Sequence, residues 1–177
     1  MRTTLALTCV LALATAGVRG QPARATEAQI KSAYLYSFGK FVEWPSGAAA
    51  PAGNTFPICV LGHDPFGATL DEVLRNASVG GQSVVARRIS TTDEAPGCRI
   101  VYVGSSEAAR LDIILASLTR APVLTVSDLP DFTDRGGMIR FVSADKRLRF
   151  EINLPPTQEA GLVMRSDLLR VATAVRK

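Results

Sequence analysis

The stretch Gly136–Leu154, GGMIRFVSADKRLRFEINL, carries the most regular pattern in the chain. In its second half apolar residues alternate with charged or polar ones, which is typical of a strand with one buried face. The apolar members are Leu148, Phe150, Ile152 and Leu154. Met138–Val142 is a second β-rich run, and the polar Ser143–Lys146 between the two runs suits an antiparallel hairpin. A sheet with one apolar face needs helices packed on it.

The rest of the chain offers further strands and helices. We predict strands at 56–61, 82–89, 98–103 and 123–126 from their continuous or alternating apolar residues. We predict helices at 26–42, at 66–75, from Ser105 onward, from Pro155 to Gly161, and at 167–175 with Ser166 as its cap. This order predicts a single α/β domain with a mixed sheet, helices on both faces and an antiparallel C-terminal hairpin.

The first 25 residues have a different composition. Met1–Arg2 precede an uncharged, mostly apolar run over 3–18, and small residues follow, which is typical of a cleavable signal peptide. Cleavage after Ala16, Gly20 or Ala25 would fit the small residues equally well. The apolar run is shorter than the roughly 20 residues that cross a bilayer. We therefore expect an exported domain over 26–177 with no membrane span after removal of the signal.

The charge of the chain argues against nucleic-acid binding. Arg2, Arg19 and Arg24 lie before Thr26 and no acid does, so removal of the leader lowers the formal net charge from +4 to +1. Basic residues cluster only at Arg87–Arg88 and around Lys146–Arg149. Neither cluster makes the extended basic patch that nucleic-acid binding needs.

The cysteines indicate a disulfide. Cys9 lies in the leader, which leaves Cys59 and Cys98 in the exported domain. An even pair in an oxidising compartment is typical of a disulfide bond. The alternative is two buried free thiols, since cysteine is also a common small core residue.

Aromatic residues gather in the first predicted helix. Tyr34, Phe38 and Phe41 recur at helical spacing, and Trp44 follows directly. One interpretation is that they pack the helix onto the sheet. The other is that some of them form an exposed patch for a protein partner, because aromatic residues are enriched at interfaces.

Little else in the chain suggests catalysis. Ser127 and Asp128 follow a predicted strand, where α/β sheets often bind ligands, although such residues are as often turns and caps. His63 is the single histidine, and the segment from Gly62 to Gly67 lacks the lysine of a phosphate-binding loop. The sequence holds no cluster of metal ligands and no dinucleotide fingerprint. We therefore expect a protein that is not an enzyme and has no cofactor.

Several segments resemble the YfiR-like family of periplasmic proteins. They span the expected exported domain in the same order. They include the first predicted helix with Tyr34, Phe38, Lys40, Phe41, Trp44 and Pro45, then ICVLG over 58–62, DPFG over 64–67 and PVLTVSD over 122–128. GGMI over 136–139, FEIN over 150–153, AGL over 160–162 and SDLLR over 166–170 continue the series.

The resemblance implies a dimeric periplasmic regulator. Its best-known members restrain the sensory domain of an inner-membrane diguanylate cyclase, which places them in cyclic-di-GMP and biofilm control, and other members serve sensor histidine kinases. Cys59 and Cys98 match a disulfide of the family, whereas the chain lacks a second cysteine pair near the hairpin. A small-solute-binding module is the alternative function, and a deep pocket with convergent polar groups would favour it.

Overall fold

The computed structural model describes residues 25–46, 52–145 and 147–177. The predicted signal peptide lies almost entirely outside these residues. The helices are α1 (Glu27–Phe41), α2 (Ala68–Leu74), α3 (Leu111–Leu118), α4 (Leu154–Glu159) and α5 (Ser166–Val171), with 3-10 turns at Ala52–Asn54, Thr92–Glu94 and Ser105–Arg110. The strands are β1 (Val42–Glu43), β2 (Thr55–Leu61), β3 (Ser78–Val79), β4 (Gln82–Ile89), β5 (Ile100–Val103), β6 (Leu124–Ser127), β7 (Ile139–Ala144), β8 (Arg147–Asn153), β9 (Val163–Met164) and β10 (Ala174–Arg176).

Eight strands form one mixed sheet in the order β10-β8-β7-β6-β5-β2-β4-β3. Strands β4, β2, β5, β6 and β7 are mutually parallel, and β8 runs antiparallel to β7. If these five strands are numbered by their position in the chain, their order across the sheet is 2-1-3-4-5, which is a common doubly wound arrangement. The predicted α/β class with an antiparallel C-terminal hairpin is confirmed.

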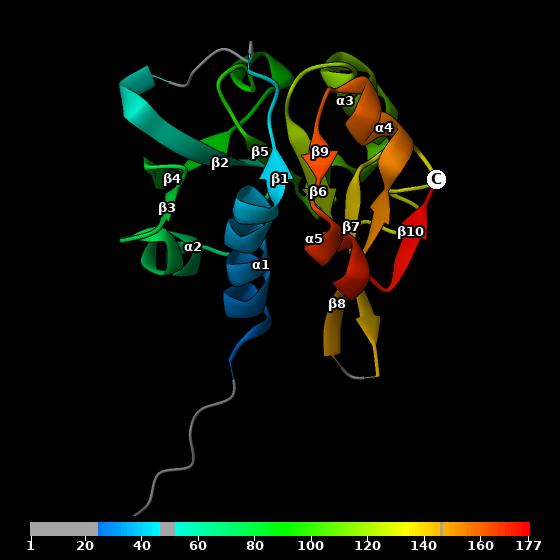
Figure 1. The fold of residues 1–177 in the computed structure, drawn as a ribbon, viewed down its shortest axis with the longest axis horizontal. Coiled ribbons are helices and arrows are strands. Elements are labelled where there is room, and N and C mark those ends of the chain that lie inside the picture. Colours follow the sequence, from blue (N-terminus) through cyan, green and yellow to red (C-terminus); the bar gives the residue numbers. More distant parts are fainter. Residues whose placement is uncertain (1–24, 47–51, 146) are drawn as a thin grey trace, which may run out of the picture.

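The sheet separates two apolar cores, because side chains of each central strand alternate between its faces. Ile58 and Val60 of β2 join the core that also receives α1, α2 and α5, whereas Leu61 joins the core that receives α3. Helices therefore cover both faces, as predicted. Figure 1 shows α1 across the middle of the molecule, with α2 on one side of it and α5 on the other.

The C-terminal hairpin follows the predicted alternation. Phe150 and Ile152 are buried opposite Phe141 and Ile139 of β7, whereas Arg149 is exposed. Strand β7 extends to Ala144, so the connection is shorter than predicted. Asp145, the residue after β7, has a left-handed backbone conformation with φ 51°, which aspartate adopts more readily than most residues.

The predicted last helix is wrong beyond Val171. Ala172 is already extended (φ −66°, ψ 144°), and residues 174–176 form β10, parallel to β8. The amide of Thr173 starts this pairing by donating to the carbonyl of Phe150 at 2.8 Å. The free edge of the hairpin thus supplies backbone partners that override the helical spacing of the sequence. The helix also begins one residue early, at Ser166, after Arg165 as its cap.

Other boundaries shift slightly. Helix α2 begins at Ala68 rather than at Phe66, because the Asp64 carboxylate accepts the amides of Phe66 and Gly67 and holds a turn there. Strand β5 begins at Ile100, and the segment after Ser105 is a 3-10 turn before α3. The pair formed by β1 and β9 was not predicted, since each strand has two residues.

A carboxylate on the outer face of the hairpin gives the fold a pH dependence. Glu151 accepts hydrogen bonds from Arg140 at 2.8 Å and from the hydroxyl of Thr133. Burial alone tends to raise the pKa of Glu151, but these bonds outweigh it and hold the pKa below 4.5. The stabilisation is therefore complete above the unfolded-state pKa and is lost as the pH falls through the lower folded-state pKa.

We expect Glu151→Gln to lower the free energy of unfolding by about 1 kcal/mol at pH 7. The difference from the wild type should shrink as the pH falls below 4.5, the usual pKa of a glutamate. Urea unfolding at several pH values measures it. An equal difference at pH 7 and at pH 3 would contradict the assigned ion pair.

Candidate functional site

An apolar groove runs between α1 and α5. It encloses about 290 Å³ and is lined by Tyr34, Ser37, Phe38, Phe41, Phe150, Asp167, Leu168 and Val171. Helix α1 supplies one wall, α5 the other, and Phe150 of β8 the floor. Val171 is 58% exposed at the rim, which is unusual for a valine beside a buried core.

The sequence positions the α1 wall by ordinary helix rules. Thr26 caps the helix: its hydroxyl accepts the Gln29 amide, and the Gln29 side chain accepts the Thr26 amide. From this fixed start, positions 34, 38 and 41 fall on one side of the helix. The ring of Tyr34 lies 6.0 Å from that of Phe38 and 5.4 Å from that of Phe150.

The four aromatic candidates have different environments. Phe38 is 0% exposed, so it is a core residue whose ring edge closes the groove, and it forms no surface patch. Tyr34 and Phe41 are half-buried in the groove wall. Trp44 lies outside the groove and packs edge-on against Phe56 at 5.1 Å. Its indole N–H is buried without an acceptor in the described structure.

The α5 wall was missed as a site because its contact with α1 depends on tertiary structure. The sequence shows only a short apolar helix around Leu168, more than 120 residues after α1. Charges stand at the rim: Asp167 pairs with Arg170 at 3.5 Å, and the Arg165 guanidinium lies 6.0 Å from the Phe41 ring. An apolar floor with a polar rim is the usual anatomy of a protein interface.

The strand-end candidates Ser127 and Asp128 have separate roles. The buried Ser127 hydroxyl donates to the Val103 carbonyl at 2.7 Å and accepts the Leu129 amide at 3.1 Å, so it holds a turn. Asp128 accepts the ammonium of Lys31 at 2.6 Å. A hollow of about 460 Å³ lies beside this pair.

Lys31 ties α1 to the end of β6. Its side chain is 7% exposed, and its ammonium bonds both Asp128 and Glu27 at 2.6 Å. Burial by itself lowers the pKa of Lys31, but the bonds to these two carboxylates raise it above its usual value. Burial, followed by the nearby Asp128 carboxylate, raises the pKa of Tyr102. This cluster was not predicted, since Lys31 falls among the polar positions of the helix pattern.

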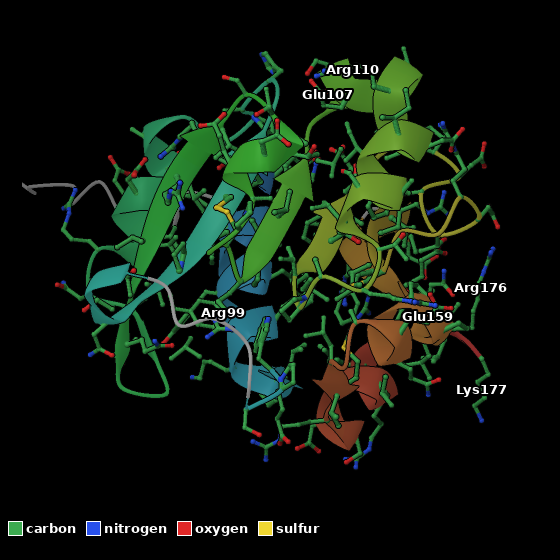
Figure 2. The ribbon with its side chains drawn as sticks, turned by 90° about the horizontal axis from the view of Figure 1, so that it is seen from above. Arg99, Glu107, Arg110, Glu159, Arg176 and Lys177 are labelled. Carbon is green, nitrogen blue, oxygen red and sulfur yellow. A yellow bond between two sulfur atoms is a disulfide. The ribbon has the colours of Figure 1, made fainter. Side chains whose placement is uncertain are left out.

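The crevice where doubly wound sheets bind phosphates is filled by the protein itself. It lies after β2 and β5, whose following helices pack on opposite faces. There the buried Glu107 carboxylate accepts the Ser106 hydroxyl at 3.0 Å, and a side chain at Gly62 would lie 2.4 Å from both. Arg110 pairs with Glu107 from the surface (Figure 2). A filled crevice with a carboxylate does not suit a phosphate group.

Cys59 and Cys98 are bonded, as predicted. Cys59 of β2 and Cys98 before β5 form a disulfide between neighbouring strands, with their Cα atoms 6.0 Å apart, visible as the yellow bond in Figure 2. Both residues are buried in the core under α3. Within the described ranges no group of three His, Cys, Asp or Glu residues could hold a metal ion. None of the described helices is long and apolar enough to cross a membrane.

Solved structures share the fold at low sequence identity. The chain is similar to a conserved domain protein of Vibrio cholerae O1 biovar eltor, with a TM-score of 0.56 and 11% identity over 85% of this chain and 60% of that one. It is also similar to an ABC domain of Streptococcus pneumoniae in complex with L-Trp, with a TM-score of 0.53 and 14% identity over 84% of this chain and 61% of that one. The chain thus spans about three fifths of each.

A comparison with family models identifies the family of the chain. The model of a family described as YfiR/HmsC-like, DUF4154, matches residues 28–173, which run from α1 to the residue before β10. The match includes both cysteines and the whole groove. This chain belongs to the YfiR/HmsC-like family.

Proposed function

We propose that this protein is a non-enzymatic periplasmic regulator that binds and restrains the periplasmic sensory part of an inner-membrane signalling protein. Family membership supports a periplasmic regulator. We propose a diguanylate cyclase as the partner, with a sensor histidine kinase as the alternative, and a homodimer as the acting form. The observation that carries the proposal is the α1–α5 groove with the exposed Val171 at its rim.

The groove suits a protein partner better than a free solute. The polar side chains of its lining are already engaged, because the Ser37 hydroxyl donates to the Ala33 carbonyl and Asp167 pairs with Arg170, so no free polar groups converge in the groove to orient a solute. An apolar side chain on a partner helix fits such a space, and rigid aromatic walls cost little entropy when they are covered. The Lys31 bond to Asp128 fixes α1 against the end of β6, and it preorganises the α1 wall of the groove.

We expect Val171→Glu to weaken binding of the partner's periplasmic domain by at least about 2 kcal/mol, or roughly 30-fold. A carboxylate at the rim would be buried without a counter-charge when the partner covers the groove. The melting temperature should barely change, because Val171 is 58% exposed. Calorimetric titration of the purified domains measures the affinity.

Ile113→Glu is the matched control. Ile113 is 74% exposed on α3, over the opposite face of the sheet, so the same change of chemistry there should leave the affinity unaltered. In cells, deletion of the gene should raise the cyclic-di-GMP made by the membrane cyclase that is proposed as the partner, and Val171→Glu should reproduce the deletion. Unchanged output in the deletion strain, or equal loss of binding from both variants, would count against the proposal.

A further inference from the structure

A smaller hollow opens on the face of the sheet opposite the α1–α5 groove. It encloses about 240 Å³ between the loop before β5 and the C-terminal end of α3. Cys98, Leu118 and Val123, which belong to the core under α3, form much of its wall. The Cys59–Cys98 disulfide fixes one side of it. The hollow is thus apolar, rigid and separate from the proposed partner site.

Arg99 is the single charged residue in the lining of this hollow. In the described part of the chain, Arg99 and Arg140 are the two arginines that are half-buried as whole residues. Arg140 is paired with Glu151 at 2.8 Å, whereas the Arg99 guanidinium makes no hydrogen bond or ion pair with any described residue. Figure 2 shows Arg99 well apart from the labelled acids Glu107 and Glu159.

The described surroundings of Arg99 do not compensate its charge. Burial lowers the pKa of Arg99, and no neighbouring carboxylate opposes that effect. Glu94, five residues earlier in the chain, accepts the amides of Ser90 and Thr91 with its carboxylate. The Ser117 hydroxyl of the lining donates to the Ile114 carbonyl at 2.8 Å. A half-buried guanidinium without an acceptor costs free energy that a bound anion would recover.

We propose that this hollow binds a small monocarboxylic acid, whose carboxylate pairs with Arg99 and whose apolar body lies against Cys98, Leu118 and Val123. The planar guanidinium matches a carboxylate through two parallel hydrogen bonds. An apolar body fits the remaining wall, which offers no other free charge. The volume of about 240 Å³ suits a short aliphatic or aromatic acid better than a larger solute.

The test is calorimetric titration of the mature protein with octanoate. We expect saturable binding to the wild type, at least tenfold weaker binding to Arg99→Gln, and at least tenfold weaker binding of octan-1-ol and octylammonium to the wild type. Ala121→Phe, which fills the hollow without touching the charge, should also weaken octanoate binding. Arg75→Gln, at an exposed arginine at the end of α2, is the matched control and should bind octanoate like the wild type.

The stability of the Arg99 variant separates a ligand site from a structural role. Because the guanidinium has no partner among the described residues, Arg99→Gln should melt at the same temperature as the wild type or higher, whereas loss of a structural contact would lower it. Equal octanoate affinity of Arg99→Gln and the wild type, equal affinity of octylammonium and octanoate, or no saturable octanoate binding at millimolar concentration would each overturn the proposal.

Discussion

Replacement of Phe150 by alanine is expected to lower the free energy of unfolding by about 3–5 kcal/mol. Phe150 is 2% exposed in the strand β8, and its ring lies 5.1 Å from that of Phe38 in an edge-on contact. Truncation therefore removes a large apolar side chain and its ring contacts, and it leaves a cavity that α1 and β7 cannot close. Because Phe150 is also the floor of the α1–α5 groove, partner binding should fall with it.

Arg149→Ala is the matched control for this experiment. Arg149 precedes Phe150, is exposed, and points to the other face of the hairpin. Its loss should change the free energy of unfolding by no more than about 0.5 kcal/mol. Urea unfolding of the three proteins, with unchanged slopes, gives the comparison. A larger cost for Arg149→Ala than for Phe150→Ala would mean that the facing of the strand is misassigned.

Local patterns predicted the regular part of the fold. The alternation around Phe150 is enforced by burial on one face, so it appears in the sequence as it does in the sheet. Strand β4 coincides with the predicted 82–89, and α1 differs from the predicted 26–42 by one residue at each end. Strand β10 was missed because its residues pair only with the edge of a hairpin more than 20 positions earlier, and nothing in residues 174–176 themselves encodes that partner.

The candidate site was predicted in part for the same reason. The spacing of Tyr34, Phe38 and Phe41 identified an aromatic helix face, but not which rings would be covered. Which rings are covered depends on α5 and β8, which lie beside α1 only in the folded chain. Lys31 and Arg99 show the same limit of prediction from local patterns. Lys31 is buried and bonds Asp128, which lies 97 residues later in the chain, and Arg99 is a half-buried charge inside an apolar segment.

Removal of the disulfide is the second large effect that we expect. The double variant Cys59→Ala/Cys98→Ala should lose about 4 kcal/mol of unfolding free energy in the chain-entropy view, because the bond closes a loop of 39 residues in the unfolded chain. The loss of two sulfur atoms from the core under α3 lowers the free energy of unfolding further, since both residues are buried there.

A reductant supplies the internal control for the disulfide experiment. Urea unfolding of the wild type in dithiothreitol should approach that of the double variant, whereas the double variant itself should be insensitive to dithiothreitol. Thiol labelling of the denatured, unreduced wild type should detect no reactive cysteine in the exported domain, because the bond consumes both thiols. Two labelled thiols, or equal stability of the wild type and the double variant, would contradict the assignment.

The disulfide joins two strands behind α3 while the groove lies on the other face of the sheet. A partner should therefore still bind that fraction of the reduced protein which remains folded.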